Sequence, residues 1–136
     1  MWPFNRSQAN LPVPRIQIGD VQVVWQDVLN GHWEFSTGEI LYTLYDNPIF
    51  DVSLINELPI VSQWIDDLRS QIEEEIKKQL EVWAEWTGDY DLVVVDVSHL
   101  IEKREVELSY AHESWADLGI NIIVAEGKIL SSEAGD

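Results

Sequence analysis

The chain of 136 residues contains no cysteine, and this absence excludes disulfides, thiolate metal sites and cysteine catalysis. Cations are scarce as well, because 8 Lys and Arg stand against 25 Asp and Glu, for a formal net charge of −17. Contacts to phosphate need cations, so this balance argues against binding to nucleic acid or to an anionic membrane. Solubility alone accounts for part of the charge.

Long apolar runs are also missing. No stretch approaches 18 apolar residues, so no membrane-spanning helix is predicted. The start of the chain lacks the continuous apolar segment of a secretory signal peptide, and a cytoplasmic location is expected. The glycines are isolated turn residues without a phosphate-cradling spacing, so no nucleotide or other cofactor is predicted.

The length and an apolar content of 46% are typical of one globular domain. Three prolines in residues 1–14 predict a flexible N-terminal arm, because proline fixes φ and lacks an N–H donor. Residues 15–131 are predicted to form a single α+β domain. The polar residues 132–136 are predicted to form a frayed tail.

Alternating apolar residues predict strands on both sides of a central segment. Before it, Asn30-Gly31 and Thr37-Gly38 separate three alternating runs, as in a meander. After it, a β-branched run over 91–97 predicts a central strand, and further alternating runs follow, with a turn at Glu126-Gly127. Residues 46–57 are open between strand and loop.

The central segment carries one apolar stripe at helical spacing. Its members are Val61, Ile65, Leu68, Ile72, Ile76, Leu80 and Trp83. Pro59 suits the first turn of such a helix, and Gly88 suits the stop. The sequence therefore predicts an α+β fold: an antiparallel sheet of about six to seven strands, ordered meander, long helix, meander, with one face covered by that single amphipathic helix.

Catalytic and metal-binding patterns are weak. His32, His99 and His112 have no helical metal spacing, and no G-x-S-x-G motif marks a nucleophile. Asp89-Tyr90-Asp91 lacks the later ligands of a calcium loop. The sequence predicts no catalytic residue, no metal ligand and no enzyme.

The seven tryptophans are the more informative residues. Trp25, Trp33 and Trp83 lie on apolar stripes and are predicted to be core, while Trp64 and Trp86 are predicted to widen the helix stripe. Trp115, beside Asp117 in a loop, is predicted to face a partner, because tryptophan anchors many interfaces. The acidic helix face adds three more candidate contact residues, which are Glu74, Glu81 and Glu85.

The last third of the chain resembles known proteins in its motifs. These are the run from Tyr110 to Ile120, then Gly127-Lys128-Ile129 and a late Gly135-Asp136. Together, over about 30 residues, they resemble the C-terminal hairpin of small uncharacterised bacterial families, several of which are similar to immunity proteins. The resemblance implies a protein that neutralises a toxin, and it carries no catalytic residues to transfer.

Three functions follow as hypotheses. The first is a non-enzymatic, immunity-like or inhibitor-like domain whose acidic face binds a basic protein partner. The second is a structural protein that self-associates, for instance as a homodimer, through Trp2, Phe4 and free strand edges. The third is a hydrolase that uses a carboxylate and a histidine in a cleft.

Overall fold

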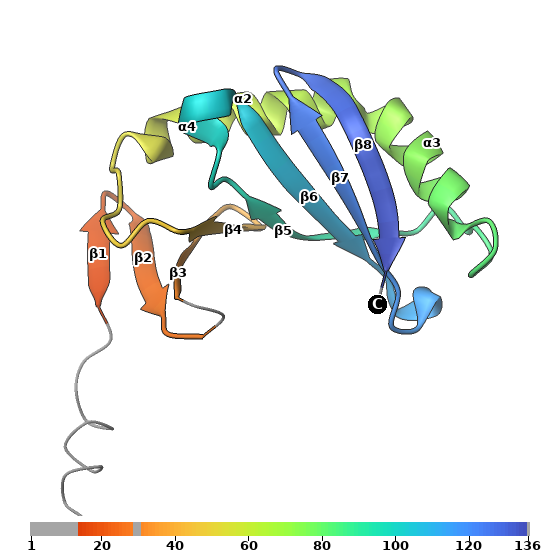
Figure 1. Ribbon diagram of the computed structural model, residues 1–136, viewed down its shortest axis with the longest axis horizontal. Helices are drawn as coiled ribbons and strands as arrows, with labels where there is room; N and C mark the ends of the chain where they lie inside the picture. The colour runs from red at the N-terminus through yellow and green to blue at the C-terminus, as the bar shows by residue number, and fades with distance from the viewer. Residues whose placement is uncertain (1–13, 29–30, 136) are drawn as a thin grey trace, which may run out of the picture.

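The computed structural model describes residues 14–28 and 31–135, which form a curved eight-stranded sheet with helices along one face (Figure 1). The strands stand side by side in chain order: β1 (Arg15–Ile18), β2 (Val21–Gln26), β3 (His32–Thr37), β4 (Ile40–Tyr45), β5 (Asp91–Asp96), β6 (Glu105–Ala111), β7 (Gly119–Ala125) and β8 (Lys128–Gly135). The α+β class is confirmed. Eight strands exceed the predicted six to seven, partly because a turn at Gly19 separates β1 from β2.

The sheet contains one parallel pair among antiparallel ones. β4 and β5 run parallel, with Tyr42 opposite Val95 and Thr43 opposite Asp96. A parallel pair needs a crossover connection, and here the two main helices supply it. The central position predicted for the run over 91–97 is confirmed, because β5 lies between β4 and β6. The burial on both faces from which it was predicted is not found, because Val93 is 49% exposed.

The prediction of one long helix is wrong, because the segment forms two helices, α2 (Leu54–Asp67) and α3 (Arg69–Leu80). They meet at Leu68, whose φ of −95° and ψ of 6° leave the helical range. Leu68 stays buried, and the apolar stripe continues from one helix to the next. The break lets the stripe change direction along the curved sheet (Figure 1).

The predicted end of the helix is also wrong. α3 stops at Leu80, and the backbone N–H of Ala84 bonds to the Leu80 carbonyl at 3.0 Å. Ala84 therefore packs against the core at the position after Leu80 where Trp83 was expected. Trp83, predicted as core, is 65% exposed.

The core lies between the helices and the face of the sheet that they cover. Alternate residues of the central strands point into it, as do the buried residues of α2 and α3. Fully buried members include Val23, Tyr42, Val95, Leu108, Ile122, Leu54, Val61, Ile72, Ile76 and Leu80. Trp33 is buried, and Trp25, Trp64 and Trp86 pack against this core, as predicted.

Two short elements remain in the described part of the chain: α4 (Leu100–Lys103) and the 3₁₀ turn η1 (Glu113–Trp115). Residues 132–135 pair with β7, so the prediction of a frayed tail is wrong for them. The predicted arm, apart from Pro14, lies outside the described residues, as do Asn30 and Asp136. None of the helices in the described part of the chain has the length and apolar character needed to cross a membrane.

Candidate functional site

A groove runs along α3 and the loop that follows it. Its lining residues are Glu74, Glu75, Lys77, Lys78, Glu81, Ala84, Glu85 and Trp86, and it is called the α3 groove below. The predicted contact residues Glu74, Glu81 and Glu85 all lie in it and are exposed. The fold thus brings three of the five predicted site residues to one surface.

The α3 groove is acidic, with four carboxylates against two lysines. Lys78 lies 3.1 Å from Glu75, whose carboxylate also accepts a 2.8 Å hydrogen bond from the Ser132 hydroxyl. The bond from Ser132, and then that from Lys78, lower the pKa of Glu75. In the described part of the chain, Glu74, Glu81 and Glu85 form no ion pair, which leaves them able to contact a cationic partner.

Two exposed apolar side chains stand between Glu81 and Glu85. Val82 is 83% exposed and Trp83 is 65% exposed. An exposed tryptophan among carboxylates is typical of an interface, since tryptophan buries a large area at low entropic cost. The stripe predicted from sequence missed it, because Trp83 is spaced three residues from Leu80 like a core residue.

Aromatic contacts hold the loop after α3 in place. Trp86 stacks on Tyr90 with ring centroids 6.0 Å apart, and the Tyr90 hydroxyl donates a 2.7 Å hydrogen bond to Glu73 on α3. Burial, followed by the bond to Glu73, raises the pKa of Tyr90. The loop that presents Trp83 is therefore tied to α3 at its far end.

The other two predicted contact residues lie elsewhere. Trp115 ends η1 and is only 3% exposed, so the prediction that it faces a partner is wrong. The turn folds its ring onto the core: the Leu118 N–H bonds to the Trp115 carbonyl, and His112 accepts from the Ser114 N–H at the start of the turn. Asp117 is exposed but does not line the α3 groove.

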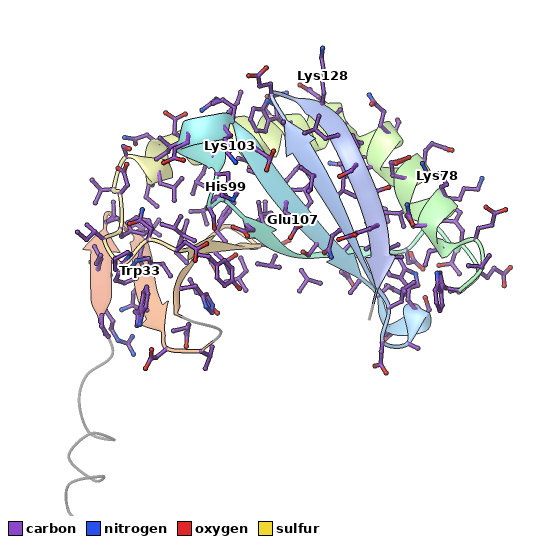
Figure 2. All side chains as sticks on the ribbon, in the orientation of Figure 1. Trp33, Lys78, His99, Lys103, Glu107 and Lys128 are labelled. Atoms are coloured by element: carbon purple, nitrogen blue, oxygen red, sulfur yellow. The ribbon has the colours of Figure 1, made fainter. Side chains whose placement is uncertain are left out.

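A second set of carboxylates lies on the face of the sheet opposite the helices. Asp96 and Glu107 stand opposite each other on β5 and β6, and both line a pocket with His99 and Glu105. Figure 2 labels His99 and Glu107 on this part of the sheet. Within the described residues, the imidazole of His99 makes no hydrogen bond to the carboxylates of these acids, although its backbone carbonyl accepts from the Glu105 N–H. Among the residues that the structure describes, no group of three or more His, Asp or Glu side chains is placed so that it could hold a metal ion.

The environment of Glu107 makes its ionisation costly. Burial raises the pKa of Glu107, and the carboxylates of Asp96, Glu133 and Glu105 raise it further. The pKa of such a carboxyl is higher in the folded chain than in the unfolded chain. Its contribution to the free energy of unfolding is fully present below the unfolded pKa, and it is lost as the pH rises through the folded pKa. Ionised Glu107 therefore opposes folding at neutral pH.

We expect Glu107→Gln to raise the free energy of unfolding at neutral pH and to lose this advantage below pH 4.5, the ordinary pKa of the residue. Urea unfolding of the variant and the parent chain at both pH values measures the difference. Glu113→Gln, at an exposed position in η1, is the control for removing one charge. An equal gain at both pH values would contradict the prediction.

The remaining histidines occupy separate places. His32 is buried on β3, where its Nε2 lies 2.8 Å from Glu34 and its ring stacks on Tyr45. The Nδ1 of His112 lies 2.7 Å from the Ser114 hydroxyl within η1 and its cap, a local turn contact. The described residues therefore do not assemble a Ser–His–Asp arrangement around either histidine.

Comparisons with models of protein families, with curated proteins and with solved structures give no match to this chain. The resemblance of its C-terminal hairpin to immunity proteins stays a prediction. An inference about function therefore has to rest on the residues of the α3 groove.

Proposed function

We propose that this chain is a non-enzymatic acidic domain that binds a basic protein partner through the α3 groove, as an inhibitor of immunity type would, in the cytoplasm. The observation that carries the proposal is Trp83, which is 65% exposed in the segment between Glu81 and Glu85, two acids that line a groove whose carboxylates outnumber its lysines. Trp83 supplies the apolar anchor of the contact. The carboxylates supply complementary charge and reject acidic partners.

Affinity capture tests the proposal. The tagged chain is incubated with lysate of its own source cells at low and high salt, beside Trp83→Ala and the triple variant Glu74→Lys/Glu81→Lys/Glu85→Lys. We expect one basic protein to be captured by the parent chain at low salt only, and to be lost from both variants. Mass spectrometry identifies it.

The charge control is the triple variant Glu39→Lys/Glu102→Lys/Glu113→Lys, which changes the net charge equally at exposed positions outside the groove. It should retain the partner. Capture of the same proteins by all variants, or of an acidic partner, would contradict the proposal.

A further inference from the structure

The strand β8 ends the sheet. It makes its ladder with β7 on one side, and no other strand of the described chain pairs with its second edge. Such an edge presents backbone N–H and C=O groups in a row and is a template for another strand. At eight residues, β8 is the longest strand of the sheet.

The turn before β8 fixes which of its backbone groups face outward. Glu126 and Gly127 both have positive φ, of 51° and 76°, as in a type I′ turn, so Ala125 and Lys128 form a hydrogen-bonded pair. In an antiparallel ladder, pairs that exchange hydrogen bonds alternate with pairs that do not. Ile129 is therefore in a pair without hydrogen bonds, and after the bulge so are Ser132 and Ala134. The backbone groups of these three residues point away from β7, to the free edge. The bond from Gln79 Nε2 to the Ser132 carbonyl, at 3.2 Å, agrees with this assignment.

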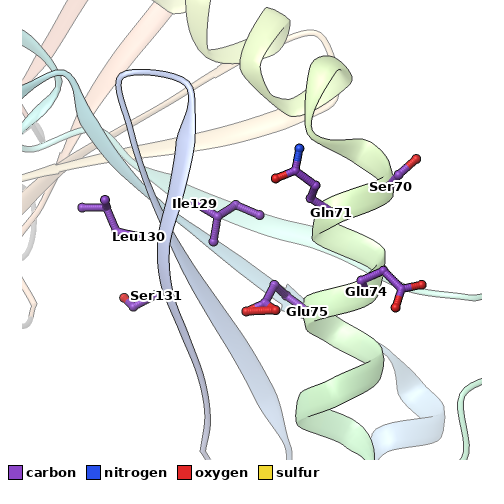
Figure 3. A pocket seen from close by; sticks show the side chains of 7 residues that line it. All are labelled: Ser70, Gln71, Glu74, Glu75, Ile129, Leu130 and Ser131. Atoms are coloured by element: carbon purple, nitrogen blue, oxygen red, sulfur yellow. The ribbon is translucent and has the colours of Figure 1, made fainter.

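A groove lies along this edge, between β8 and α3 (Figure 3). It is lined by Ser70, Gln71, Glu74, Glu75, Ile129, Leu130 and Ser131, and it shares Glu74 and Glu75 with the α3 groove. Figure 3 shows Gln71 and Glu75 on the helix and Ile129 on the strand projecting into the space between the two elements. Leu130 is the extra residue of a bulge in β8 and is 60% exposed.

Carboxylates flank the edge on both sides. Glu74 and Glu75 stand on α3, while Glu133 stands on β8 beyond the bulge and is exposed. Side chains of an added strand alternate between its two faces, so cationic residues on either face would meet one of these acids. A second copy of the chain would bring its own set of carboxylates close to Glu74 and Glu133, and repulsion between like charges disfavours self-pairing at this edge.

We propose that the partner is held by strand addition: an extended segment rich in Lys and Arg pairs with the free edge of β8 in the groove beside α3. This inference rests on the proposed function and names how the basic partner binds. Backbone bonds to Ile129, to Ala134 and to the N–H of Ser132, whose carbonyl already accepts from Gln79, give the segment its direction. Glu74 and Glu133 select its charge.

A random seven-residue peptide library displayed on phage, selected on the full chain, tests this proposal. We expect the selected peptides to carry Lys or Arg and to lack proline at their centre. The best peptide is then synthesised with and without N-methyl groups on alternate amides, which preserve its charge but remove donors. The N-methylated form should bind about tenfold more weakly or worse, because several backbone bonds are lost.

Two variants of the chain complete the test. Ala134→Pro removes an edge-facing N–H without removing a bond to β7, so it should weaken the peptide while the fold persists. Glu74→Lys should also weaken it, whereas Glu102→Lys, the same change at an exposed position on α4, should not. Amide NMR shifts induced by the peptide should concentrate on β8 and α3.

The outcomes separate this inference from the proposed function. If the basic peptide and its N-methylated form bind equally, or the NMR shifts avoid β8, strand addition is wrong while binding of a basic partner stands. If selection yields no basic peptide, or the free chain is already a dimer whose β8 amides are protected, strand addition is overturned. In either of those cases, the affinity capture decides the proposed function independently.

Discussion

Association with a basic partner is expected to slow by about 10- to 1,000-fold when the salt concentration rises from about 0.01 M to about 1 M. Over this range the screening length falls from about 30 Å to about 3 Å, so the field of the chain no longer reaches an approaching molecule. Glu74, Glu81 and Glu85 are exposed to solvent, where this screening acts fully. Stopped-flow mixing with the captured partner measures the rate.

The variant with Glu74, Glu81 and Glu85 changed to lysine shows where the steering field comes from. At low salt it should associate about tenfold more slowly or worse than the triple control at Glu39, Glu102 and Glu113. Both variants have the same net charge, so the difference measures the position of the acids. Equal rates would mean that the overall charge of −17 attracts the partner and that the groove has no special part.

Replacing Leu108 with alanine is expected to lower the free energy of unfolding by about 2–5 kcal/mol. Leu108 is fully buried on β6, between Val95 on β5 and Ile122 on β7, so its removal leaves a cavity in the centre of the core. The total free energy of unfolding of a native protein is about 5–15 kcal/mol, so this substitution removes a large share of it. Urea unfolding measures it.

The same substitution at Leu130 is the control. Leu130 is 60% exposed at the bulge of β8, and its replacement by alanine should change the free energy of unfolding by only about 0.5 kcal/mol. A cost at Leu108 no larger than that at Leu130 would place the centre of the core elsewhere.

Periodicity predicted the interior of the helical segment but not its ends or its break. The stripe from Val61 to Leu80 is buried or packed on the core, because local spacing alone decides which face is apolar. No proline or glycine marks the break at Leu68 in the sequence. The break follows the curvature of the sheet, and that curvature depends on how the whole chain packs. Spacing alone could not tell Trp83 from Ala84 as the next core residue.

The candidate site was predicted in part for the same reason. Exposed acids on a helix face, such as Glu74 and Glu81, follow from the position of the stripe. The burial of Trp115 could not be predicted from the loop sequence around it, because it results from the turn of η1, which folds the ring back onto the core. The groove beside β8 depends on the order of strands in the sheet, which local sequence does not determine.

The short parallel seam between β4 and β5 bears on how the chain folds. Strands β1 to β4 pair only with sequence neighbours, and so do β5 to β8, so closing the loops within each half costs little entropy. The seam has just two register pairs, Tyr42 with Val95 and Thr43 with Asp96, and each joins residues 53 positions apart in the chain. Closing this seam costs more loop entropy than any pairing within either half, so we expect the union of the two halves to be the slow step of folding.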